Sequence, residues 1–260
     1  MEIIIRKTAE ECAEFAAKIV ENYLRINQRP VLGLATGSTP LRLYKILIQK
    51  NKEQAISFKK CVTFNLDEYV GLTSDHAQAY RHYMDTELFQ HTDIQIENTH
   101  VPDGMAEDLR QECQRYETAI RNSGGIGLQI LGIGSNAHIG FNEPMCSLSS
   151  RTWVKILSRE TIRANARFFN SPEEVPKHCI TMGIGTIMEA KHCIVLATGE
   201  SKADAVVNMI EGPISANCPA SILQMHPRTT IIVDEDAAKR LQNKSHYTWV
   251  EQNKLDWQQY

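Results

Sequence analysis

A histidine and a glutamate stand five residues apart in the stretch GIGSNAHIGFNEP, residues 132–144, as His138 and Glu143. The stretch follows the apolar residues Ile130 and Leu131, and polar side chains placed directly after a buried strand often face a ligand-binding crevice. Imidazole titrates near neutral pH and can both take and return a proton, while Glu143 is suited to hold the ring in one tautomer. The residues predict a proton-transfer pair, although a turn with a structural histidine fits the same residue types.

Two adjacent carboxylates, Asp67 and Glu68, follow a second run with strand character, residues 62–64. Asp67 stands between the apolar Leu66 and the aromatic Tyr69. Partial desolvation there would raise its pKa and let it act as a base on a carbon acid. The alternative is that both carboxylates solvate a loop or cap a short helix.

A third strand end leads into a short loop that contains Gly37, Ser38 and Thr39. We expect a helix from Pro40 with Thr39 as its N-cap, so that the unpaired N–H groups of the first turn favour an anion. The loop is neither a Walker A motif nor a GxGxxG fingerprint. It predicts phosphate binding by Gly37, Ser38 and Thr39, and an ordinary strand-to-helix turn is the alternative.

Other kinds of chemistry find little support in the residues. No serine or cysteine lies in a GxSxG setting, which argues against acyl transfer. One histidine and one glutamate make a poor metal site without a third ligand, so we expect no metal. The seven cysteines are scattered and form no CxxC pair, which is typical of reduced thiols rather than of a disulfide framework or a zinc site.

Charge and hydropathy limit the partners and the location. The net charge of −3 at pH 7 gives no electrostatic reason to expect nucleic acid. The N-terminus lacks the pattern of a signal peptide, and no apolar run approaches the ~18 residues of a membrane span. We therefore expect a cytoplasmic protein without a nucleic-acid or membrane partner.

Short apolar runs alternate with longer segments of helical periodicity along the chain. Strands are predicted at residues 2–6, 30–35, 61–66 and 127–134, and helices at 8–27, 39–49, 76–89 and 106–122. The first helix carries a capping box of Thr8 and Glu11. The alternation continues to residue 241, and the polar tail 251–260 is expected to be a surface extension.

This alternation predicts a three-layer α/β fold, in which a mostly parallel, Rossmann-like sheet has helices on both faces. We expect one domain over residues 1–260, because the chain contains no internal repeat or linker. Ligands of such folds bind outside the carboxyl ends of the strands. The three polar strand ends should therefore face one site.

Taken together and in order, the segments TGSTP, NLDEYVGL, GIGSNAHIGFNEP, RANARFF and TGESKADAV resemble the glucosamine-6-phosphate deaminase family. The resemblance covers essentially the whole chain, and NLDEY followed by HIGFNEP is a specific combination. The related phosphogluconolactonases share the fold and the first loop but lack a GFNEP-like run. The resemblance implies a domain of the ribose-5-phosphate isomerase and CoA transferase type, and an aldose–ketose isomerisation that releases ammonia without a cofactor.

The resemblance also implies roles for four residues in converting glucosamine 6-phosphate to fructose 6-phosphate. His138 would move a proton from the anomeric hydroxyl to the ring oxygen, with Asn136 and Glu143 as its orienting partners. Asp67 would then remove the proton from carbon 2 of the open chain and give an enolamine. A proton returned to carbon 1 and loss of ammonia from carbon 2 complete the reaction.

The phosphate group of this substrate would lie at the start of the second helix, on Gly37, Ser38 and Thr39. The resemblance adds Arg167 and Lys202 as cations for the phosphate. By themselves, both cations would be interpreted as exposed surface residues.

The sequence departs from the best-known form of the family at several positions. Asn136 replaces an aspartate of the hexameric members, and Ala137 replaces a glycine, so we expect a backbone without a strongly positive φ at residue 137. Trp153 stands where an arginine of the allosteric phosphate site is expected, and Cys146 stands where a serine is expected, while Lys155 remains. We expect a small non-allosteric type that is a monomer or a small homo-oligomer.

Two alternatives remain at this stage. The first is a non-catalytic sugar-phosphate sensor, which would not need the acid–base set Asp67, His138 and Glu143. The second is a lactonase or isomerase that acts on another phosphosugar. Release of ammonia from glucosamine 6-phosphate would distinguish the deaminase from both.

Overall fold

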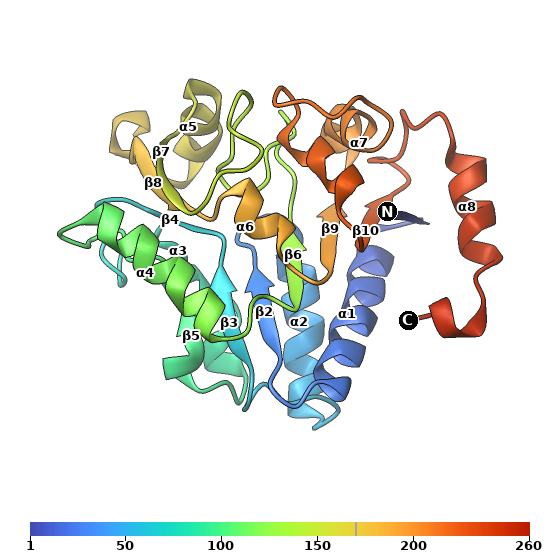
Figure 1. Ribbon diagram of the computed structural model, residues 1–260, viewed down its shortest axis with the longest axis horizontal. Coiled ribbons are helices and arrows are strands. Elements are labelled where there is room, and N and C mark those ends of the chain that lie inside the picture. The colour runs from blue at the N-terminus through green and yellow to red at the C-terminus, as the bar shows by residue number, and fades with distance from the viewer. Residues whose placement is uncertain (170) are drawn as a thin grey trace.

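The computed structural model describes residues 1–169 and 171–260. In this part of the chain, seven strands form one sheet in the order β1-β10-β9-β6-β2-β3-β5, and all neighbouring strands run parallel (Figure 1). The strands are β1 (Glu2–Arg6), β2 (Val31–Leu34), β3 (Val62–Asn65), β5 (Thr99–His100), β6 (Leu128–Leu131), β9 (Cys193–Ala197) and β10 (Thr229–Asp234). The predicted parallel sheet is confirmed.

Helices cover both faces of this sheet, as the sequence predicts. One hydrophobic cluster combines the sheet with α1 (Ala9–Ile26), α2 (Ser38–Lys52) and α3 (Tyr80–Glu87). The other cluster includes side chains of α4 (Leu109–Asn122) and α7 (Ala203–Ile210). The cluster on the α4 side also contains α6 (Ile184–Met188). In β1, β9 and β10, successive apolar side chains alternate between the two clusters, as expected of strands that helices cover on both faces.

A second, antiparallel sheet lies beside the first and was not predicted. Its order is β4-β8-β7, with β4 (Asp67–Tyr69), β8 (His178–Thr181) and β7 (Trp153–Ile156). Asp67 pairs with Thr181, and Thr181 pairs with Trp153 on its other side. Asp67 therefore lies in a strand, not in the solvated loop of the alternative interpretation.

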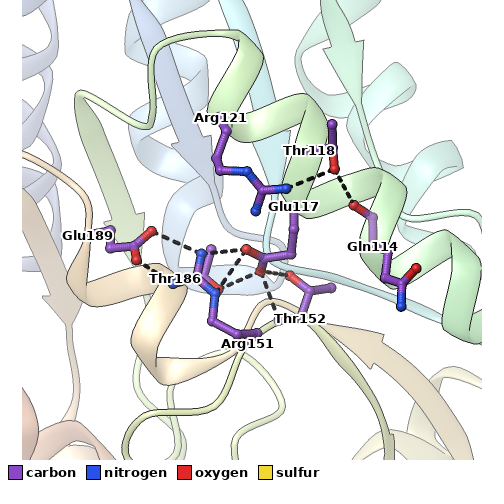
Figure 2. A network of polar contacts seen from close by, with 8 residues as sticks. All are labelled: Gln114, Glu117, Thr118, Arg121, Arg151, Thr152, Thr186 and Glu189. Carbon is purple, nitrogen blue, oxygen red and sulfur yellow. Dashed lines mark hydrogen bonds and ion pairs between the residues drawn. The ribbon is translucent and has the colours of Figure 1, made fainter.

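A buried carboxylate on α4 fixes the segment that enters β7. Glu117 accepts hydrogen bonds from the backbone N–H and the hydroxyl of Thr152, and from the hydroxyl of Thr186 on α6 (Figure 2). Arg151 forms an ion pair with Glu117 and a second one with Glu189. Although burial opposes it, these donors lower the pKa of Glu117. The network therefore connects the large sheet's helical layer to the small sheet that carries Asp67.

Helix starts agree with the sequence in some places and differ in others. Thr8 caps α1 by accepting from the N–H of Glu11, as predicted, whereas the Glu11 carboxylate accepts from the N–H of Lys7. The prediction for the second helix is wrong by two residues, because α2 begins at Ser38 with Gly37 as its N-cap. Gly37 has φ +98°, a conformation open to glycine, and this turns the chain into the helix early.

The helix predicted over residues 76–89 is shorter than expected, since α3 spans Tyr80–Glu87. The C-terminal segment contains α8 (Lys244–Gln252), and residues 251–260 lie mostly exposed on the surface, as expected. The tail is nevertheless held at its end, because the hydroxyl of Tyr260 donates to Glu2 and bonds Thr230. Across the two described segments, no helix combines the length and apolar character that a membrane span requires.

Candidate active site

A cavity of about 600 Å³ lies at the carboxyl ends of β2, β3 and β6. In the sheet, β3 and β5 lie on one side of β2, and β6, β9 and β10 lie on its other side. The boundary between β2 and β6 is thus a topological switch point, where open α/β sheets bind ligands. Nearly all of the predicted site residues line this cavity: Gly37, Ser38, Thr39, Asp67, Asn136, His138, Arg167 and Lys202. The exception is Glu143, which does not line the cavity but lies beside the cavity residue His138.

Asp67 faces the cavity from β4 with 6% of its surface exposed. Burial, together with the charge of Glu68, raises the pKa of Asp67 to about 8. The nearby Gly140 has φ +55°, and a Cβ there would lie 3.0 Å from the Thr181 hydroxyl and 3.5 Å from Asp67 Oδ2. A side chain here would press on the Thr181 hydroxyl, while its contact with the Asp67 carboxylate would be an ordinary van der Waals one; the positive φ also favours glycine at this position.

Glu143 binds residues from two different segments with its two oxygens. Oε2 accepts from Asn136 Nδ2 at 2.8 Å and lies 3.6 Å from His138 Nδ1. Oε1 accepts from the hydroxyls of Ser158, at 3.1 Å, and Thr161. Burial alone would raise the pKa of Glu143, but His138, Thr161 and Asn136 outweigh it and lower the pKa to about 2. Glu143 is therefore ionised and lies beside the imidazole ring, although His138 Nδ1 makes no hydrogen bond to it or to another described residue. The role of Glu143 as an orienting partner stays a prediction.

The loop around His138 depends on two small residues. A Cβ on Gly134 would lie 2.3–2.5 Å from atoms of the His138 ring, so this position must be glycine for the ring to lie here. The expectation for Ala137 is wrong, because its φ is +63°. Two hydrogen bonds within the turn, Gly134 N–H to the His138 carbonyl and Ala137 N–H to the Gly134 carbonyl, hold it. The left-handed region costs an L-residue about 1–2 kcal/mol, which the turn accommodates.

The predicted phosphate residues lie on the same cavity but come from three segments. Ser38 and Thr39 form the first turn of α2, although Thr39 is not its N-cap. Arg167 lies on the 3₁₀ helix Ala166–Phe168 that follows α5 (Arg159–Asn165). Lys202 donates to the carbonyl of Ile133 at 2.8 Å, and burial together with Arg167 lowers the pKa of Lys202. Two cations and a helix N-terminus thus face one space, which favours a bound anion.

Several cavity residues were missed in the sequence. Tyr69, Tyr80 and Phe141 form an aromatic wall with ring centroids 5.0–6.0 Å apart. Asn165, at the end of α5, donates to the hydroxyl of Tyr69 at 2.7 Å. The periodicity gave no signal for these contacts, because those of Phe141 and Asn165 join segments more than sixty residues apart.

The cavity therefore contains a buried carboxylate that can be protonated near neutral pH, and an imidazole with an ionised partner. Such a pair of groups suits proton transfer at a carbon acid and between oxygens. Within the described residues, His, Cys, Asp and Glu side chains form no group of three or more that could hold a metal ion.

Residues 5–232 match the family model described as glucosamine-6-phosphate isomerases/6-phosphogluconolactonase. The chain belongs to this family. A glucosamine-6-phosphate deaminase from Corynebacterium kroppenstedtii is 49% identical over 260 residues, which is 100% of both chains. One from Shewanella woodyi is 51% identical over 251 residues, which is 96% of this chain and 95% of that one. The family resemblance stated from the sequence motifs is confirmed.

Solved structures of family members agree with the fold. A monomeric glucosamine-6-phosphate deaminase aligns with a TM-score of 0.90 and 44% identity, over 92% of this chain and 99% of that chain. A 6-phosphogluconolactonase from Trypanosoma brucei aligns with a TM-score of 0.74 and 17% identity, over 92% and 98% of the two chains. At that identity the second likeness concerns the fold alone.

Proposed function

We propose that the protein converts glucosamine 6-phosphate and water to fructose 6-phosphate and ammonia. The observation that carries this proposal is that Asp67 and His138 line the same cavity as a helix N-terminus and two cations, with Glu143 beside His138. Relatives named glucosamine-6-phosphate deaminase match over the full length at about half identity, whereas the lactonase likeness is weak in sequence. Both support deamination over the lactonase and sensor alternatives.

Ring opening is the first step, because the acidic proton at carbon 2 exists only beside the open aldehyde. His138 takes the proton of the anomeric hydroxyl and returns it to the ring oxygen as the ring bond breaks. The ionised Glu143, 3.6 Å from Nδ1, stabilises the imidazolium formed between these two events. Asn136 holds the same Glu143 oxygen and keeps it beside the ring.

Isomerisation follows on the open chain. Asp67, as a carboxylate, removes the proton from carbon 2, and the electron pair forms the carbon 1–carbon 2 double bond while the π bond of the carbon 1 aldehyde breaks. The aldehyde oxygen takes a proton from the neighbouring ammonium group, which leaves a neutral enolamine. A proton added at carbon 1 produces an iminium group at carbon 2. Water adds to that carbon, and ammonia leaves as the carbonyl of fructose 6-phosphate forms. The ammonium group of the substrate favours the charged form of Asp67 and lowers its pKa on binding.

The phosphate group supplies binding energy away from the reacting carbons. Ser38 and Thr39 offer the free N–H groups of α2, and Arg167 and Lys202 offer positive charge. No cofactor or metal takes part in this scheme. We place the reaction in the cytoplasm and in a single domain of residues 1–260, acting as a monomer or a small homo-oligomer.

The proposal includes kinetics without allosteric activation. Trp153 cannot pair with phosphate as an arginine does, and the ammonium of Lys155 lies 4.5 Å from the centre of its ring. We expect a hyperbolic rate curve that N-acetylglucosamine 6-phosphate leaves unchanged. A sigmoidal curve that this sugar converts to a hyperbola would contradict the interpretation of Trp153.

The direct test is to mix the purified protein with glucosamine 6-phosphate and to measure ammonia and fructose 6-phosphate. Both products should form in equal amounts. Hydrolysis of 6-phosphogluconolactone, with no ammonia released from glucosamine 6-phosphate, would favour the lactonase. Binding of glucosamine 6-phosphate without turnover would favour the sensor. Either result would refute the deaminase proposal.

A further inference from the structure

α3 lies between the strand that carries Asp67 and the loop that begins α2. Its N-terminal end contacts β4, and one turn further along, the hydroxyl of Tyr83 donates to the carbonyl oxygen of Gly37 at 2.6 Å. Tyr83 also lines the cavity. One short helix thus connects the strand that carries Asp67 with the loop that begins α2.

The N-terminus of α3 is held by a side chain from the neighbouring strand. Its N-cap residue is Ala79, and an alanine side chain cannot accept a hydrogen bond. Glu68, which is 3% exposed, takes this place by accepting from the N–H groups of Tyr80 and Arg81, both at 2.9 Å. Free N–H groups at a helix start need such acceptors. Glu68 therefore fixes α3 on β4 and with it the position of Tyr83.

The bond to Gly37 determines the direction of a neighbouring donor. The carbonyl of Gly37 and the N–H of Ser38 belong to one planar trans peptide group, in which the two point in opposite directions. The carbonyl is directed toward Tyr83, so the N–H of Ser38 is directed away from Tyr83. Ser38 is the first residue of α2, and its N–H has no partner within the helix.

We propose that Tyr83 is a positioning residue for phosphate: its hydroxyl holds the Gly37–Ser38 peptide so that the Ser38 N–H is presented to the anion. The inference rests on the proposed function for the identity of the sugar phosphate, but its anion-binding part can be tested without any turnover. Burial raises the pKa of Tyr83, so the phenol remains a donor throughout the working range. Gly37, at φ +98°, leaves the peptide free to rotate when this bond is lost.

The test compares Tyr83→Phe with a matched control, Tyr23→Phe. The hydroxyl of Tyr23 likewise donates to a backbone carbonyl, that of Val31, at 3.2 Å. Val31 is the first residue of β2 and therefore lies at the end of the strand away from the cavity. Calorimetric titration with inorganic phosphate at constant ionic strength gives the dissociation constant of each variant. Thermal unfolding of both variants separates a loss of stability from a loss of anion binding.

We expect Tyr83→Phe to weaken phosphate binding about two- to tenfold, as the loss of one net hydrogen bond does, and Tyr23→Phe to match the wild type. With glucosamine 6-phosphate, Tyr83→Phe should raise KM by the same factor and change kcat much less. An unchanged phosphate affinity in Tyr83→Phe would overturn the inference, as would a wild type that binds no phosphate. Weakened phosphate binding in a protein that releases no ammonia would uphold it and refute the deaminase proposal instead.

Discussion

Asp67 and Glu143 are buried to almost the same degree, with 6% and 5% of their surfaces exposed, yet their pKa values move in opposite directions. Burial raises the pKa of Asp67 to about 8, and the charge of Glu68 adds to it. Around Glu143 the same burial is outweighed by His138, Thr161 and an amide, and the pKa falls to about 2. At equal burial, the donors and charges around a carboxylate therefore decide whether it is ionised.

The opposite pKa values suit two different tasks. A base that must take a proton at neutral pH works best with a pKa near the operating pH, which describes Asp67. A carboxylate that stabilises an imidazolium must stay charged, which describes Glu143 beside His138. Two titratable groups whose surroundings separate their pKa values are a frequent sign of an acid–base site.

The largest effect expected from this comparison is the loss of turnover in Asp67→Asn. The amide keeps the shape of the side chain but cannot accept the carbon 2 proton, and general-base contributions are typically ~10²–10⁴-fold. Steady-state ammonia release measures the loss, and substrate affinity by calorimetry should change far less. A variant that keeps more than about a tenth of the wild-type rate would remove Asp67 from the mechanism.

The second prediction concerns stability, where the two carboxylates should differ in sign. The folded-state pKa of Asp67 lies above its unfolded value, so its contribution is present at low pH and is lost as the pH rises toward about 8. Asp67→Asn should therefore be more stable than the wild type at pH 9. The folded-state pKa of Glu143 is lowered, so its contribution is present above the unfolded value and is lost as the pH falls toward about 2. Glu143→Gln should be less stable at pH 7.

Thermal unfolding measures both differences, and each kcal/mol corresponds to roughly 2–4 °C in Tm for a chain of this size. The advantage of Asp67→Asn should decrease as the pH is lowered from 9 to 5. The deficit of Glu143→Gln should decrease below about pH 4.5. Shifts of the same sign in both variants at neutral and high pH would contradict the contrast between the two sites.

A smaller effect is expected from Thr161→Val, which keeps the shape of the side chain and removes one donor to Glu143. Loss of this donor destabilises the Glu143 carboxylate. We therefore expect kcat to fall by up to about tenfold, or ~1.4 kcal/mol. The free energy of unfolding should fall by about 1.5–3 kcal/mol. Thr118→Val is the control, because its hydroxyl bonds a carbonyl on the exposed surface of α4. Equal effects of the two substitutions would mean that the donor to Glu143 has no special role.

The last prediction is a shift in the pH profile of Glu68→Gln, measured as the position of the acid limb and not as its height, because the amide also replaces one of the two oxygens that accept from Tyr80 and Arg81. Removal of the Glu68 charge lowers the pKa of Asp67, because that charge raises it, so the acid limb of kcat/KM should move to lower pH. Ionisation of the substrate contributes the same pH dependence to both enzymes, so it cancels when the variant is compared with the wild type. Asp103, whose charge raises the pKa of Glu68, is unchanged in this variant. An acid limb that stays in place would separate Glu68 from the titration of Asp67.

Much of the site could be predicted because the information is local. The apolar runs that end at Leu34, Asn65 and Leu131 mark buried parallel strands, and parallel strands place their carboxyl ends at one edge. The residue types that follow these ends, such as Asp67 and His138, were therefore expected near one another. Arg167 and Lys202 were found through the family motifs, since single exposed-type cations carry no local signal.

The parts that could not be predicted depend on contacts between distant segments. The pairing of β4 with β8 joins residues more than one hundred positions apart, and short strands of this kind have no distinctive period. The bonds of Glu143 to Ser158 and Thr161, and the φ of Ala137, likewise follow from how loops pack. The early start of α2 at Ser38 depends on a single positive φ at its N-cap.

Chain order and side-chain periodicity are local properties, so the order of the elements, the parallel sheet and the chemical types at its edge could be derived from the sequence. Part of the contrast between the two carboxylates is local as well, since Glu68 is next to Asp67 and His138 lies five residues before Glu143. How far each pKa moves depends on the tertiary structure. Asp67 is buried beside another carboxylate, whereas Glu143 also accepts a hydrogen bond from Thr161, which folding brings from another segment.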